Sequence, residues 1–140
     1  MKPRLFGSSG IRGLANVDIT ATLAQRVGAA LATVHTGGCA VVGRDPRLTG
    51  PMLESALLSG LASGGADAIS LGLAPTPVTA WMVSETGSDA GVEVTASHNP
   101  PQYNGLKVFN GDGVSLTVKE QLELEKILED ESYRLAPWSH

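Results

Sequence analysis

Residues 39–71 read CAVVGRDPRLTGPMLESALLSGLASGGADAISL, and this stretch decides the fold class. It opens with a short apolar run at residues 39–42, which is typical of a buried strand. Gly50 and Pro51 then open a helix, because proline suits the first helical turn. Gly64 ends this helix, and residues 66–71 form a second short apolar run. The order of strand, helix and strand predicts two parallel strands joined by a helix.

The alternation of helices and strands continues through the rest of the chain. Further helices are predicted at about residues 20–35, 78–86 and 117–131, and further strands at residues 91–95 and 106–109. Asp18 or Thr20 caps the first of these helices, and Thr117 caps the last. Trp81 and Met82 are expected in the core.

The predicted fold class is therefore α/β, a three-layer α/β/α sandwich with a mixed, mostly parallel sheet of about four strands. Residues 1–132 are expected to form this domain, and residues 133–140 to be a linker or a truncated end. Right-handed crossovers bring the loops after successive strands to one edge of the sheet. Those loops carry Arg44-Asp45, Pro75-Thr76-Pro77 and Ser97-His98-Asn99, so a ligand site is expected at that edge.

The composition indicates one domain with an aliphatic core, since 42% of the 140 residues are hydrophobic and only 4% are aromatic. The net charge of −4 argues against a nucleic-acid partner. A single cysteine, Cys39, excludes an internal disulfide and is itself expected in the core. No apolar run reaches the roughly 18 residues of a membrane helix, and no signal peptide opens the chain. We therefore expect a cytoplasmic protein without a membrane partner.

The sharpest chemical feature is the serine loop, residues 95–101, which reads TASHNPP and follows a predicted strand. Ser97 is either a nucleophile or phosphate carrier, or a loop hydroxyl that bonds its own backbone. His98 is either a base or a loop histidine that bonds a carbonyl, and adjacent residues in extended chain point apart. Glu93 is unusual in the apolar strand before the loop, and the sequence gives no physical reason for it.

Several basic residues lie within three positions of a glycine, namely Arg12, Arg44, Arg47 and Lys107. A cation next to flexible backbone is a common way to hold a phosphate, although each residue alone is also typical of a surface turn. Arg44 and Asp45 are expected to form a buried ion pair that orders the loops. Pro75 and Pro77 are expected to form a rigid structural turn that faces the site.

Four motifs resemble the signatures of the α-D-phosphohexomutases and occur in the same order. They are FGSSGIRG at residues 6–13, VGRDPR at 42–47, GLAPTP at 72–77 and TASHNPPQYNGLK at 95–107. Any one would be weak, but together they cover nearly the whole chain and are very specific. Tyr103-Asn104-Gly105 is similar to the phosphoglucomutase/phosphomannomutase branch, whereas the phosphoglucosamine branch more often has an acid before Asn-Gly.

The resemblance implies a phosphoserine mechanism. A phosphoserine gives its phosphoryl group to a hexose monophosphate, the bound 1,6-bisphosphate turns over in the site, and its other phosphate returns to the serine. Ser97 would be that phosphoserine and, through its phosphate, a ligand of Mg²⁺. Arg12 and Lys107 match cations around it, and His98 matches a neighbour that contacts substrate or aids proton transfer. The residues that would support the phosphate loop are Ser9, Gly10, Asn99 and Asn104.

Members of the family have four domains, and this chain is long enough for one. The resemblance thus implies an N-terminal domain that is inactive alone and whose partners are a hexose phosphate and the other domains of the same enzyme. The Asp-rich metal loop of the family, DGDxDR, does not occur in the sequence, so the main Mg²⁺ ligands would lie elsewhere. Hexose 1,6-bisphosphate is the implied activator. Apolar surface left exposed also favours self-association.

Other interpretations stay open. The chain resembles, less closely, a phosphoglucosamine mutase domain. Its glycine-rich loops also suit a non-catalytic phosphate-binding α/β module, but neither GxGxxG nor GxxxxGK[ST] occurs. A serine hydrolase that uses Ser97 and His98 lacks a third catalytic member.

Overall fold

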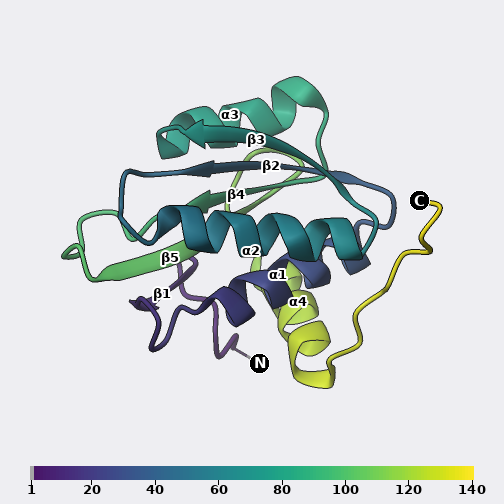
Figure 1. Cartoon of the computed structure of the whole chain (residues 1–140), viewed down its shortest axis with the longest axis horizontal. Helices are drawn as coiled ribbons and strands as arrows, with labels where there is room; N and C mark the ends of the chain where they lie inside the picture. Colours follow the sequence, from purple (N-terminus) through teal and green to yellow (C-terminus); the bar gives the residue numbers. More distant parts are fainter. Residues whose placement is uncertain (1) are drawn as a thin grey trace.

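The computed structural model of the protein describes residues 2–140 (Figure 1). Helices and strands alternate as the sequence predicts. The elements are β1 (Ile11–Leu14), α1 (Ala21–Val34), β2 (Cys39–Arg44), α2 (Gly50–Ser63), β3 (Asp67–Leu73), α3 (Thr76–Thr86), β4 (Ala90–Val94), β5 (Tyr103–Asn110) and α4 (Val118–Asp130).

The strands form one mixed sheet in the order β1-β5-β4-β2-β3. Strand β2 lies between β3 and β4 and is parallel to both, whereas β5 is antiparallel to β4 and β1. All strands except β5 therefore run in one direction, which confirms a mixed, mostly parallel sheet. The sheet has five strands where about four were expected, because part of the glycine-rich opening pairs as β1 with β5, from Ile11–Leu106 to Leu14–Tyr103.

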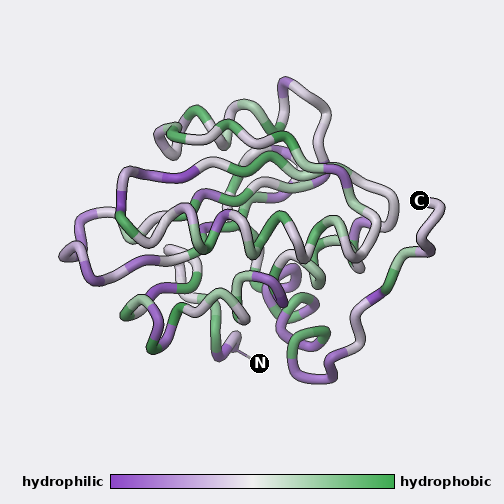
Figure 2. The backbone as a smooth tube through the Cα atoms, viewed as in Figure 1, coloured by the Kyte–Doolittle hydropathy of each residue, from purple (hydrophilic) through white to green (hydrophobic). Residues whose placement is uncertain are grey.

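The helices cover the two faces of the sheet, as the three-layer prediction requires (Figure 1). Helices α1 and α2 lie on one face, with α4 packed against α1, and α3 lies on the other. The main core lies between the sheet and α2, where Val42, Val92 and Leu106 meet Leu53 and Leu57. Figure 2 shows apolar residues along the central strands and a hydrophilic loop after β2.

Helices α1 and α2 approach each other closely at two glycines. A Cβ on Gly28 would meet the carbonyl oxygen of Leu57, and one on Gly60 would meet that of Gln25. Neither position has room for a side chain, so the helix pair is fixed at short range.

Helix α3 makes a thinner layer, with only Thr79 and Val83 buried. These two residues are four positions apart and lie on one side of the helix. The expectation that Trp81 is a core residue is wrong, because it is two positions from each of them and is 58% exposed. Met82 is only half-buried.

The N-caps of α1 and α4 test the caps that the sequence predicts. Thr20, and not Asp18, caps α1, since its hydroxyl accepts from the Leu23 N–H at 3.1 Å. Thr117 caps α4 in a reciprocal capping box with Glu120, as predicted.

Cys39 is the half-buried first residue of β2, so the prediction that it lies in the core is wrong.

The chain after α4 runs back along the ends of α1 and α2. The Arg134 N–H donates to the Thr33 hydroxyl at 2.9 Å, and the Arg134 guanidinium donates to the Gly64 carbonyl at 2.8 Å. The Ala136 N–H donates to the Ser63 carbonyl at 2.9 Å.

Within residues 2–140, no helix combines the length and the apolar character that a bilayer crossing requires.

Candidate functional site

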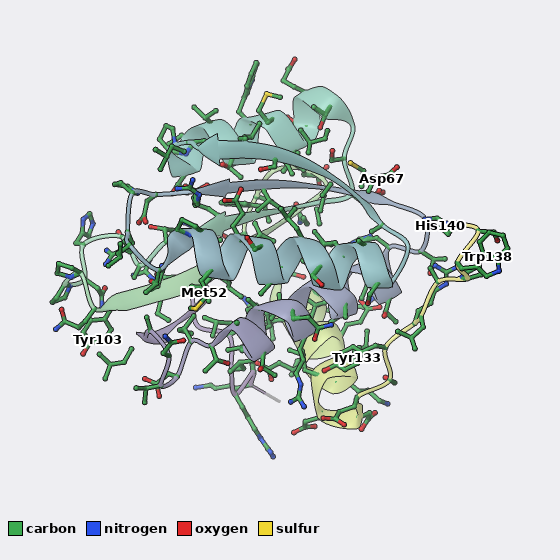
Figure 3. All side chains as sticks on the ribbon, viewed as in Figure 1. Met52, Asp67, Tyr103, Tyr133, Trp138 and His140 are labelled. Atoms are coloured by element: carbon green, nitrogen blue, oxygen red, sulfur yellow. The ribbon has the colours of Figure 1, made fainter. Side chains whose placement is uncertain are left out.

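The carboxyl ends of β2, β3 and β4 meet at one edge of the sheet, as parallel strands require. An open cavity of about 630 Å³ lies there. The loops after all three strands line it, and they contribute Arg44, Asp45, Pro75, Ser97 and His98. The edge is at the left of Figure 3, where Tyr103 is labelled, and Asp67 and His140 lie at the opposite end. The expected gathering of the loops is therefore confirmed.

Ser97 is exposed in the cavity and has an unusual backbone conformation. Its φ is 54°, in the left-handed region, which costs a residue other than glycine about 1–3 kcal/mol. Its N–H donates to the Thr95 hydroxyl at 3.0 Å. Among residues 2–140, no partner binds the Ser97 hydroxyl or the His98 ring, and His98 is exposed. The serine hydroxyl is therefore open to a ligand.

Asp45 anchors the serine loop from the neighbouring strand. Its Oδ2 accepts from the Thr95 hydroxyl at 2.6 Å, and from Arg47 Nε at 3.1 Å. The expected Arg44–Asp45 ion pair is wrong. Arg44 Nε instead donates to Glu54 Oε2 at 2.6 Å, because adjacent residues at the end of a strand point to opposite sides.

Arg47 has more contacts with the serine loop than any single-residue pattern in the sequence indicates. Its guanidinium donates to three carbonyls of the serine loop, those of Pro100 at 2.7 Å and of Ser97 and Asn99 at 2.9 Å, and to the carbonyl of Tyr103, the first residue of β5, at 3.0 Å. The Arg47 side chain is 10% exposed. The sequence predicted Arg47 as a candidate phosphate-binding cation and as a member of the VGRDPR motif, and no local signal marks its contacts with residues 50 or more positions away.

Arg12 lies on β1 opposite Gly105 of β5. A Cβ on Gly105 would meet the carbonyl oxygens of Ile11 and Thr95 and would lie 2.9 Å from Arg12 Cγ, so glycine leaves the space that the arginine crosses. Arg12 Nε is buried and has no hydrogen-bond partner in the described part of the chain. A buried donor without a partner calls for an explanation such as a water or ion that binds there, and guanidinium suits an anion.

The Lys107 ammonium lies over an aromatic ring of its own strand. It lies 5.7 Å from the centre of the Phe109 ring, further along β5. Neither Lys107 nor Arg12 lines the cavity at Ser97. The structure therefore brings Ser97 and His98 together with the β2 and β3 loops, whereas the two expected cations are not among the residues that line the cavity.

Glu93 is fully buried at the floor of the cavity. Its Oε2 accepts from the Thr79 hydroxyl at 2.6 Å, while Oε1 has no partner among residues 2–140. Burial, and to a smaller extent the charges of Asp45 and Glu54, raise the pKa of Glu93 from 4.5 to about 7. This supplies the physical account that the sequence lacked: the carboxyl joins β4 to α3.

The four residues expected to support the phosphate loop have different surroundings. Gly10, with φ 85°, lies against the backbone of β5, where a Cβ would lie 2.9 Å from Lys107 Cα. Asn104 is fully buried and donates to the Thr49 hydroxyl at 2.9 Å, which joins β5 to the start of α2. Ser9 and Asn99 are half-buried. Of the four, Asn104 is committed to protein contacts.

Pro75 and Pro77 open helix α3. Pro75 is its N-cap in extended conformation, and Pro77 lies in the first turn, where its missing N–H costs nothing. The expected rigid element is therefore a helix start and not a separate turn.

Residues 2–140 contain no group of three or more His, Cys, Asp or Glu side chains placed to hold a metal. The described residues therefore offer no cluster of protein ligands for the expected Mg²⁺.

The family model described as "Phosphoglucomutase/phosphomannomutase, alpha/beta/alpha domain I" matches residues 3–135. The probable phosphoglucosamine mutase of Thermococcus kodakarensis is 47% identical over 136 residues, which are 97% of this chain and 30% of that protein. The phosphoglucosamine mutase of Clostridium kluyveri is 45% identical over 130 residues, 90% of this chain and 29% of that protein.

Solved structures agree with this match. A phosphoglucomutase/phosphomannomutase family protein of Burkholderia thailandensis superimposes with a TM-score of 0.82 at 32% identity, over 94% of this chain and 31% of that one. A putative phosphomannomutase of Thermus thermophilus gives a TM-score of 0.81 at 31% identity, over 91% of this chain and 30% of that one. The chain spans about 30% of the length of the curated relatives.

Proposed function

Because the chain belongs to the phosphoglucomutase/phosphomannomutase family as its α/β/α domain I, we propose that it supplies the phosphoryl-carrying serine of a hexose phosphate mutase. One observation carries the assignment to Ser97. Its hydroxyl is exposed and unpartnered among residues 2–140, at a cavity lined by three strand ends, on a backbone held in the left-handed region.

The reaction moves one phosphoryl group at a time. The bond between phosphorus and Ser97 Oγ breaks as a bond forms to a hydroxyl oxygen of the hexose monophosphate, whose proton passes to a base. His98, beside Ser97, is the candidate base. The bisphosphate then returns its other phosphoryl group to Ser97 Oγ, so that the net result is transfer between C1 and C6.

This chain's part in the reaction is to hold and surround the phosphoserine. A phosphoserine carries a charge of about −1.5 to −2 at neutral pH, and phosphoryl transfer depends chiefly on positioning and positive charge. The unpartnered Nε of Arg12 supports a role in binding one of the phosphates. Lys107 would have to leave the Phe109 ring to join it. Mg²⁺ supplies further positive charge in the family, and the roles given to these residues do not depend on it.

Glucosamine phosphate is the substrate we propose to test first. The curated relatives are named phosphoglucosamine mutases, whereas the solved structures carry phosphomannomutase or family names. The preference for the glucose/mannose branch, which rested on Tyr103, has no support from these relatives. The chain would act together with further domains of the same enzyme, with the corresponding 1,6-bisphosphate as activator.

The test follows phosphate from labelled hexose 1,6-bisphosphate into the complete natural protein. We expect one labelled residue, Ser97, and we expect Ser97→Ala to lose both the label and turnover while its melting temperature changes little. Ser132→Ala is the matched control, since Ser132 is an exposed serine away from the cavity. Label on another residue, or normal turnover by Ser97→Ala, would show the proposal to be wrong.

A further inference from the structure

We propose that Arg47 is a positioning residue that holds Ser97 in its left-handed conformation, and this rests on the proposed function of Ser97. The two residues are 50 positions apart, on the loops after β2 and β4. Arg47 is connected to both backbone groups of Ser97, its carbonyl and its N–H. It donates directly to the Ser97 carbonyl at 2.9 Å, and it holds Asp45, which holds Thr95, whose hydroxyl accepts the Ser97 N–H.

The guanidinium of Arg47 has no capacity left for a ligand. Arginine has five N–H donors in a fixed fork. Here Nε binds Asp45, Nη1 binds the carbonyls of Pro100 and Tyr103, and Nη2 binds those of Ser97 and Asn99. To bind a phosphate, Arg47 would have to give up a contact with the loop. Its role is therefore toward the loop and not toward the substrate.

The same contacts orient the backbone carbonyl oxygens of the serine loop. Arg47 binds the carbonyl oxygens of Ser97, Asn99 and Pro100, and the Asn99 N–H binds that of Ala96. Carbonyl oxygens that faced the cavity would repel a phosphate. With these oxygens bound elsewhere, the left-handed turn presents the Ser97 hydroxyl to the cavity at a fixed place. Misplacement of a reacting atom by about 1 Å can lower a rate by about 10²-fold.

Lysine cannot reproduce these contacts, because it is a point charge on a flexible stem. In the complete natural protein we expect Arg47→Lys to lower kcat, and the rate of phosphoryl transfer from bisphosphate to Ser97, by about 10²-fold with little change in KM. We expect guanidinium ion to restore part of the rate of Arg47→Ala, and methylammonium ion to restore none. Arg26→Lys is the matched control, because Arg26 forms an exposed ion pair with Glu131.

A spectroscopic measurement on the 140-residue chain separates loop order from folding. In Arg47→Lys we expect the backbone amide signals of Ser97, His98 and Asn99 to show lower order parameters or exchange broadening, with the signals of β2 and β4 unchanged. Unchanged order and unchanged rates in Arg47→Lys would overturn the proposal. If neither variant folds, Arg47 serves the fold alone and the proposal is also wrong.

The outcomes keep the two proposals apart. If Ser97→Ala has normal turnover, the proposed function fails whatever Arg47 does. If Ser97→Ala is inactive while Arg47→Lys transfers phosphate at the normal rate, the proposed function stands and the positioning role of Arg47 is refuted.

Discussion

Replacement of Glu93 by glutamine will remove a large part of the pH dependence of stability between pH 4.5 and about 7. Glu93 is fully buried, and one of its oxygens has no partner among residues 2–140. The pKa of Glu93 is raised from 4.5 to about 7 by burial and by the nearby charges of Asp45 and Glu54, against the hydrogen bond from Thr79. Lys107 is its neighbour across β4 and β5.

The sign follows from linkage. The folded state holds the Glu93 proton more tightly than the unfolded state, so the stabilising effect is complete below pH 4.5. It is lost as the pH rises through about 7, where the folded protein must bury an ionised carboxylate. A shift from 4.5 to about 7 corresponds to about 3 kcal/mol at most, reached above the folded pKa. Glutamine keeps the shape and an acceptor for Thr79 and carries no charge.

The assay is urea unfolding of the unaltered chain and of Glu93→Gln at several pH values from 5 to 8, followed by circular dichroism. The difference in free energy of unfolding cancels the titration of other groups. We expect it to shift in favour of the glutamine variant by about 2–3 kcal/mol between the two ends of this range. Glu85→Gln, at an exposed position of α3, should show no such shift. A difference that stays constant with pH would refute the reasoning.

The remaining predictions concern the scaffold of the site. Gly105→Ala will lower the free energy of unfolding by more than about 2 kcal/mol, since its Cβ would meet the carbonyl oxygens of Ile11 and Thr95; thermal unfolding will measure this, and an unchanged melting temperature would contradict it. Glu54→Ala will cost about 1.5–3 kcal/mol, because it removes the charged partner of Arg44, whose side chain is 22% exposed. Urea unfolding of that variant at pH 7 checks it, and a loss below about 0.5 kcal/mol would count against a structural ion pair.

The fold could be predicted largely from local patterns. The apolar runs at residues 39–42 and 66–71, with a helical period between them, imply a parallel unit wherever such a unit occurs. That topology alone brought Ser97, Asp45 and Pro75 to one edge of the sheet. What escaped prediction was the pairing of β1 with β5, because it joins residues about 90 positions apart.

The directions of side chains in the loops could not be predicted from the sequence either. Arg44 and Asp45 are adjacent and opposite in charge, which made an ion pair the simplest hypothesis, but one points to α2 and the other to β4. Trp81 was expected in the core, yet α3 buries only one narrow side. Arg47 could not be singled out, since its contacts all depend on how the loops close in three dimensions.

The thin layer made by α3 has a dynamic consequence. Only Thr79 and Val83 anchor this helix in the core, whereas β2 and β4 lie inside the sheet. Regions with few buried contacts open locally at a lower free energy than the whole domain unfolds. The amide hydrogens of α3 should therefore exchange with solvent by local opening, whereas those of β2 and β4 should exchange only through global unfolding. We expect each such opening to admit water to Glu93, since Thr79 of α3 is its hydrogen-bond partner, so the floor of the cavity should open more often than the whole domain unfolds.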